Sequence, residues 1–294
     1  MNITRNRRFL LVAGKIVVVV LTLYFLYLAI FTVPDTLLSW QGILQSARQS
    51  DYTFLLILSA LLIPANWGLE AWKWQLLGQK LERISYLRAF RAVMVGLTLG
   101  FITPNRLGDY AGRVLELKSK ERLEGIGAVF IGRFCQLVAT VLVGSLGLIY
   151  FALLLYWRDY PAICLSVFFL LLVLNAALLL LLFNARAMVA LVAAVGPLRK
   201  LAKYLAIMGR YTFMEMNRVL LLSLVRYFVF LLQFVLLLIL FEVRLSPVEY
   251  LSGVSTAFFL KSVVPSVSLL SDLGVRELSA MYVFGCWGRS GCRC

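Results

Sequence analysis

Two long runs of this sequence, 134–157 and 162–183, contain no charged residue. Each run is about long enough to cross the ~30 Å hydrocarbon core of a bilayer as an α-helix. The composition agrees, with 62% hydrophobic residues, 15% charged residues and a mean hydropathy of +0.91. Soluble domains are only about half apolar. The sequence therefore predicts an integral membrane protein of the all-α class.

Apolar runs separated by basic connectors predict a polytopic chain with five to six full spans. Those that the pattern delimits best are 9–33, 53–77, 126–156, 161–183 and 219–241. Basic residues precede the first of these and crowd the connector 184–218, so the positive-inside rule predicts a cytoplasmic N-terminus in a bacterial inner membrane. The spans use nearly all of the 294 residues, which predicts one membrane domain, 1–285, followed by an atypical tail, 286–294.

Residues 92–103 are apolar but number only about a dozen before Pro104, short of the ~20 that a spanning helix needs. Basic residues flank both sides of the run. These features predict a re-entrant segment that dips into the membrane and returns, with its turn lining a cavity. A long tilted crossing is the alternative.

A second broken segment follows near 255–277 and is predicted to enter from the opposite side. Both segments place proline ahead of Leu-Gly, with an aspartate beside that pair and an arginine soon after. The matching residues are Pro104, Leu107, Gly108, Asp109 and Arg113 in the first segment and Pro265, Asp272, Leu273, Gly274 and Arg276 in the second. Two interrupted segments in oppositely oriented halves predict a degenerate inverted repeat.

Asn66, Glu70 and Lys73 follow i, i+4, i+7 spacing and so share one face of the second span. Ionisable groups within a bilayer are costly and usually face a cavity. The alternative is a structural Glu70–Lys73 pair near the interface, with Lys73 snorkelling and Trp72 and Trp74 as interfacial anchors.

Arg133 and Arg226 are predicted to lie several helical turns inside their spans. The planar fork of an arginine suits a phosphate or a carboxylate. Two other interpretations stay open: an ion pair with Glu70, Asp109 or another acid for either arginine, and snorkelling for Arg226.

Arg106, Asp109 and Arg113 predict a phosphate-binding turn in which Gly108 allows close approach of backbone N–H groups. A solvated loop with a local Asp109–Arg113 pair is the alternative. The complete predicted lipid-headgroup site is Arg106, Asp109, Arg113, Arg133, Glu70, Asn66, Lys261, Asp272, Arg276 and Glu277, with backbone turns at Pro104, Gly108, Pro265 and Gly274. Gly96 and Gly100 form a GxxxG pattern, which predicts close helix packing.

The chain contains no histidine, which removes the commonest general base and the usual zinc motifs. We expect no metal and no cofactor. The net charge of +15 lies mostly in connectors beside apolar helices, which favours contact with anionic membrane lipids over nucleic acid.

Three stretches carry a family resemblance: "PNRLGDYAGR", then "FIGRF", and later "DLGVRE". Together they resemble the lysylphosphatidylglycerol synthase transmembrane-region family, also called flippase-like, from the first span to about Gly285. The family's first motif reads roughly Pro-x-Arg-x-Gly-Glu with a downstream arginine. It matches Pro104, Arg106, Gly108 and Arg113, with Asp109 in place of the glutamate.

The resemblance also has departures. Gly132 stands where the family commonly has the acid of a Glu-Arg pair, so only Arg133 remains. Ser-Leu-Leu-Ser-Asp precedes Leu-Gly-Val-Arg-Glu where the family is usually glycine-rich. What the resemblance still implies is an arginine-lined cavity. The tail "CWGRSGCRC" replaces a further apolar helix, and we expect a truncated or frameshifted end there.

Family members fused to an aminoacyltransferase domain make and flip lysyl-lipid, and this chain has no room for that domain. The resemblance therefore implies the translocating half alone or a stand-alone relative. Our leading hypothesis is a translocator, not an enzyme, whose cargo is an anionic or aminoacylated phospholipid or a polyprenyl-linked lipid. The alternative is a non-transporting scaffold that docks a separately encoded lipid- or glycan-modifying enzyme on the connector 184–218. A third class, a lipid-modifying enzyme with Glu70 or Asp109 as base, lacks an evident nucleophile or metal site.

Overall fold

The computed structural model describes residues 50–103, 107–119, 122–196, 199–240 and 245–263. Every regular element in these ranges is helical. Four helices are long and apolar enough to cross a membrane: α3 (Ser50–Gly78), α6 (Gly125–Tyr156), α7 (Pro161–Phe183) and α10 (Phe213–Leu240). They confirm four of the predicted spans. The span predicted at 9–33 and the tail 286–294 lie outside the described residues.

The boundaries of these helices follow local chemistry. Proline at the first position starts α7, where a missing N–H costs nothing. α10 begins six residues before the predicted start at 219, because Thr212 and Glu215 form a capping box. The Glu215 carboxylate accepts from the Thr212 N–H at 2.8 Å, and the Thr212 hydroxyl accepts from the Glu215 N–H at 3.3 Å.

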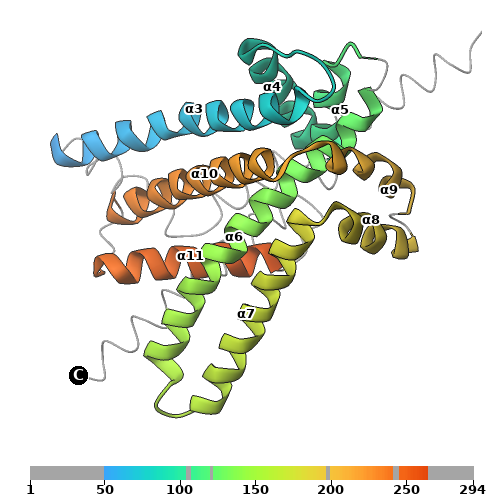
Figure 1. The fold of residues 1–294 in the computed structure, drawn as a ribbon. Coiled ribbons are helices and arrows are strands. Elements are labelled where there is room, and N and C mark those ends of the chain that lie inside the picture. Colours follow the sequence, from blue (N-terminus) through green and yellow to red (C-terminus); the bar gives the residue numbers. More distant parts are fainter. Residues whose placement is uncertain (1–49, 104–106, 120–121, 197–198, 241–244, 264–294) are drawn as a thin grey trace, which may run out of the picture.

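The apolar run at 92–103 belongs to α4 (Tyr86–Ile102), which packs antiparallel on α5 (Leu107–Leu115). Two glycine contacts set the geometry. A Cβ on Gly112 would lie 2.6 Å from the Cα of Gly96, and a Cβ on Gly108 would lie 2.7 Å from the backbone N of Gly100. The close packing predicted from Gly96 and Gly100 is therefore confirmed, and it brings the chain back toward the end where α4 began (Figure 1).

α11 (Pro247–Val263) packs antiparallel on α6. The contact again uses small residues: a Cβ on Gly144 would lie 2.6 Å from the Cβ of Phe259, and one on Gly147 would lie 2.0 Å from the Ser255 hydroxyl. Figure 1 shows α3, α10 and α11 aligned, with α6 crossing them.

Several connectors gather at one end of the bundle, together with η2 (Arg122–Glu124), α8 (Ala185–Ala194), α9 (Arg199–Leu205) and η4 (Ala206–Arg210). We call this the connector end; its described residues are 79–85, 116–119, 122–124, 184–196 and 199–212. Tyr211 donates to the backbone carbonyl of Leu77 at 2.7 Å, and Arg210 pairs with Glu124 at 2.9 Å. These contacts join the end of α3 to the segments that precede α6 and α10.

Glu82 joins the loop after α3 to the segment after α5. Its carboxylate accepts from Arg88 at 2.5 Å and from the backbone N–H groups of Lys118 and Ser119, both at 2.7 Å. Partial burial raises the pKa of Glu82, but these donors outweigh burial and hold the pKa below its ordinary value of 4.5.

A depressed pKa in the folded protein means that the Glu82 contacts stabilise the fold above about pH 4.5 and that this contribution is lost as the pH falls through the folded pKa. We expect the melting temperature of Glu82→Gln, measured in detergent, to fall less than that of the wild type when the pH is lowered from 7 to 3.5. Equal losses in the two proteins would contradict this role.

The Gly96–Gly112 contact leaves no room for a methyl group. We expect Gly112→Ala to cost about 1–3 kcal/mol of unfolding free energy through overpacking, visible as a lower melting temperature. Gly209→Ala is the matched control, because no atom lies within 4 Å of a Cβ there. Equal melting temperatures for the two variants would show that α4 and α5 do not pack closely.

Candidate functional site

The face predicted on α3 is present and buried. Asn66, Glu70 and Lys73 are 2%, 4% and 1% exposed. At a rise of 1.5 Å per residue, Glu70 lies about 12 Å along α3 from its end at Gly78. Glu70 and Asn66 therefore lie at least two turns inside this long apolar helix, and Lys73 lies more than one turn inside it.

The Glu70 carboxylate pairs with three cations, one from its own helix and two from other helices. Its Oε2 lies 2.8 Å from Lys73 Nζ and 2.6 Å from Arg226 Nη1, and its Oε1 lies 2.8 Å from Arg113 Nη1. Arg113 comes from α5 and Arg226 from α10. A single carboxylate thus ties α3 to both of these helices.

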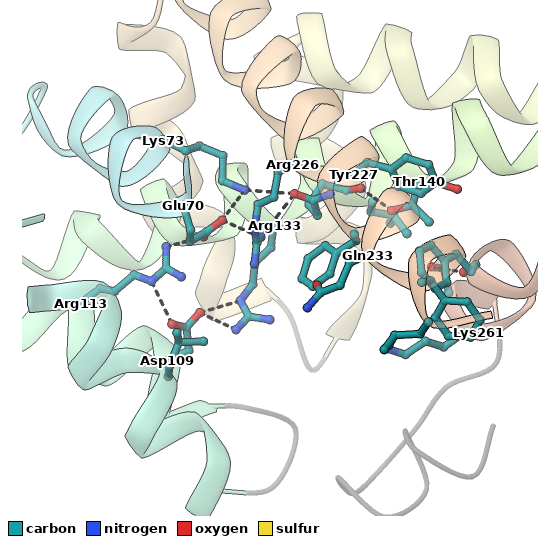
Figure 2. Close-up of a pocket in the computed structure, with 18 residues that line it drawn as sticks. Glu70, Lys73, Asp109, Arg113, Arg133, Thr140, Arg226, Tyr227, Gln233 and Lys261 are labelled. Atoms are coloured by element: carbon teal, nitrogen blue, oxygen red, sulfur yellow. Dashed lines mark hydrogen bonds and ion pairs between the residues drawn. The ribbon is translucent and has the colours of Figure 1, made fainter. Parts of the chain in front are cut away.

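Asp109 continues the network. Its Oδ1 accepts from Arg113 Nε at 2.9 Å, and its Oδ2 accepts from Nε of Arg133 at 3.1 Å and from Nη2 of the same side chain. Arg133 lies on α6. The ion pairs therefore run without a break from Arg226 on α10 to Arg133 on α6, by way of Glu70 on α3 and the α5 residues, and so connect four helices (Figure 2). We call Glu70, Lys73, Asp109, Arg113, Arg133 and Arg226 the charged cluster.

Neutral groups hold the cluster in place. The Asn66 Oδ1 accepts from Arg226 Nε at 2.7 Å, and the Gln136 Oε1 faces Lys73 at 3.5 Å and Arg226 at 3.4 Å. Arg133 lies over the ring of Tyr110, 5.3 Å from its centroid, in cation–π geometry.

These contacts decide between the interpretations left open by the sequence. Lys73 and Arg226 do not snorkel: the amine of Lys73 is buried, the side chain of Arg226 is only 17% exposed, and both pair with Glu70. Trp74 is 1% exposed and belongs to the core, so only Trp72, 50% exposed, fits an interfacial anchor. Arg133 pairs with Asp109, and the Asp109–Arg113 pair is buried, not solvated.

The charged cluster lines one part of a cavity of about 600 Å³. The opposite part is lined by apolar and aromatic side chains and by Lys261 of α11, with Gln233 and Tyr227 between them (Figure 2). The apolar lining residues are Leu97, Leu137, Phe230, Phe234, Leu237 and Phe258. The cavity therefore has a cationic part and a hydrophobic part, as the binding site of an amphiphile requires.

Arg133 is the most solvent-accessible member of the charged cluster. Its side chain is 35% exposed, against 17% for Arg226 and 5% for Arg113. A ligand that enters the cavity therefore meets Arg133 first.

The structure brings together the predicted residues Glu70, Asp109, Arg113, Arg133 and Lys261 around this cavity. Asn66 lies behind it and positions Arg226. Gly108 faces α4, and its N–H donates to the Thr103 hydroxyl at 2.7 Å. The predicted residues Arg106, Asp272, Arg276, Glu277, Pro104, Pro265 and Gly274 lie outside the described residues.

Several lining residues were absent from the predicted site, among them Lys73, Gln136, Arg226 and Tyr227. Charge at membrane depth was the available signal for Lys73 and Arg226. Periodicity could not separate a cavity role from snorkelling, because that depends on which helices face each other.

The family model described as "Lysylphosphatidylglycerol synthase TM region" matches residues 10–291. The chain belongs to this family. No curated protein and no solved structure gives a significant match. Membership, together with four apolar helices, makes the chain an integral membrane protein of a family related to lipid modification or translocation.

Removal of the charge on Glu70 should destabilise the protein. Glu70→Gln keeps the shape but leaves the facing cations without their carboxylate, and breaking a buried ion pair in this way costs about 3–5 kcal/mol. Glu116→Gln is the control, because its partner Arg91 is 74% exposed and surface pairs contribute about 0–1 kcal/mol. The ordering is checked by denaturant unfolding in detergent. A Glu70→Gln protein as stable as Glu116→Gln would contradict the network.

Proposed function

We propose that the protein is a lipid translocator of the bacterial cytoplasmic membrane, whose cargo is an anionic or aminoacylated phospholipid or a polyprenyl-linked lipid. The observation that carries the proposal is the cavity. Among the described residues it combines, at membrane depth, five cationic side chains, two carboxylates and an apolar wall. Charges at this depth are expensive and generally mark a pathway for polar cargo.

The headgroup binds first at Arg133. Its phosphate accepts from Arg133 Nη1, while Nε and Nη2 of the same guanidinium stay on Asp109, because the arginine fork offers donors to more than one oxyanion. Acyl or prenyl chains then lie along the apolar wall formed by Phe230, Phe234 and Phe258. Glu70 and Asp109 hold the arginines in place when no lipid is bound.

The helix arrangement supports a re-entrant hairpin and an inverted repeat. α4 leaves the connector end and α5 returns toward it, while α11 runs antiparallel to α6 and so enters from the opposite end. Lys261, near the end of α11, reaches the same cavity as the α5 cluster. Two short helices that approach one cavity from opposite ends are typical of alternating-access transporters.

The charge distribution supports a cytoplasmic connector end. Basic residues such as Lys80, Arg83 and Arg186 lie there, as the positive-inside rule expects of cytoplasmic connectors. Since α3 runs toward this end, Ser50 at its start would lie outside, and one further span before it would place the N-terminus in the cytoplasm.

Binding by charge gives no direction of transport. Attraction to the cluster is the same for a lipid that arrives from either leaflet, so a gradient or a reaction that consumes the lipid must supply the direction.

Translocation of a fluorescent phospholipid in proteoliposomes tests the proposal. We expect Arg133→Gln to lower the rate at least tenfold, because a charge-assisted contact contributes about 1.5–3 kcal/mol. The variant also removes one partner of the buried Asp109, so its melting temperature is measured alongside and the rates are compared for folded protein.

The double variant Arg186→Gln/Arg199→Gln is the control on the exposed connector. It should transport like the wild type. If it loses function in cells while Arg133→Gln keeps it, the scaffold for a separately encoded enzyme is the better account. Wild-type protein that moves no lipid in either direction would contradict the translocator.

A further inference from the structure

The charged groups of the cavity are strongly unbalanced, and this bears on which headgroup it accepts if the protein translocates lipid as proposed above. Among the described lining residues, five are cations and two are carboxylates, an excess of three positive charges. The cations are Lys73, Arg113, Arg133, Arg226 and Lys261. Without Lys261, the charged cluster still has four cations against two carboxylates, and at low dielectric such an excess of positive charge favours an anionic occupant.

All four oxygens of the two carboxylates are already engaged. Glu70 Oε1 faces Arg113, and its Oε2 faces Lys73 and Arg226. Asp109 Oδ1 accepts from Arg113, and its Oδ2 accepts from Arg133. An ammonium group on a ligand would have to displace one of these cations to find an acidic partner, and it would add to the excess positive charge.

The groups left over are hydrogen-bond donors. Arg133 uses Nε and Nη2 on Asp109, and within the described ranges its Nη1 has no contact with an acceptor. The hydroxyl of Tyr227 is buried in the cavity wall and has no hydrogen-bond partner in the same ranges. Because the Arg133 side chain is 35% exposed, a ligand oxygen can accept from its Nη1, and a hydrogen bond to a charged group contributes about 1.5–3 kcal/mol.

We propose that the cavity selects lipids whose headgroup is a phosphate without an ammonium group, and that it discriminates against zwitterionic and aminoacylated lipids. The selection comes from the excess of cations and from the saturation of Glu70 and Asp109. It narrows the cargo to anionic lipids. The apolar wall accepts acyl and prenyl chains alike, so the tail does not contribute to the choice.

Lipid binding to the purified protein in detergent, measured by native mass spectrometry, tests this selection. The probes are phosphatidic acid, phosphatidylglycerol, phosphatidylethanolamine and lysylphosphatidylglycerol with identical dioleoyl chains, so that only the headgroup differs. We expect the first two to bind at least about tenfold more tightly than the last two, with phosphatidic acid ahead of phosphatidylglycerol because it carries more negative charge. A polyprenyl monophosphate added as a fifth probe shows whether a phospholipid or a prenyl lipid supplies the phosphate.

Gln136→Glu links the selectivity to the site. The Gln136 Oε1 already faces Lys73 and Arg226, so an isosteric carboxylate there lowers the excess charge without a change of shape. We expect this variant to lose several-fold of the preference for anionic lipids. Arg186→Gln, exposed on α8 and remote from the cavity lining, should keep the full preference.

The outcomes separate this inference from the proposed function. Equal or tighter binding of lysylphosphatidylglycerol by the wild type would overturn the selectivity and leave the translocator standing. A preference that Gln136→Glu and Arg186→Gln change equally would also overturn it, because general surface charge would then be the cause. Absence of binding by every probe would overturn both.

Discussion

The Glu70 carboxylate is the contact on which the interior of this protein depends. It binds one lysine and two arginines from three helices at 2.6–2.8 Å, in a part of the bundle that water does not reach freely. Each of those cations would be expensive at membrane depth without it. Glu70 pairs with three cations and Asp109 pairs with two. Every charged group in the cluster therefore has an oppositely charged partner, while the net charge of the cluster stays positive. That combination keeps the arginines fixed and the cavity attractive to an anion.

Small residues make the cluster possible. Arg113 and Asp109 reach the centre of the bundle only because α5 lies directly on α4, and that contact depends on glycines at 96 and 112. The same device recurs where Gly144 and Gly147 let α11 approach α6 and carry Lys261 toward the cavity. Helix contact in membranes generally relies on such small residues, since hydrophobicity alone does not hold helices together there.

Much of this fold can be read from the sequence, because uncharged runs of membrane length admit few structures. The helix at 161–183 is found with the predicted bounds, and the start of α10 is missed only because a capping box precedes the apolar run. The site is harder. Spacing alone places Asn66, Glu70 and Lys73 on one face, but whether Arg226 pairs with Glu70 or snorkels depends on helix neighbours that no local pattern encodes. The inverted repeat stays a prediction, since its second turn lies outside the described residues.

The most direct test of an anion-filled cavity is the identity of the lipid that occupies it in cells. A photo-cross-linking amino acid at Leu137, which lines the cavity one turn beyond Arg133, captures the occupant, and the adduct is identified by mass spectrometry. The same amino acid at Leu146, 68% exposed on the same helix and remote from the cavity lining, samples the surrounding lipids. The account predicts that adducts at Leu137 are enriched in anionic lipid relative to those at Leu146. Equal composition at both positions would contradict it.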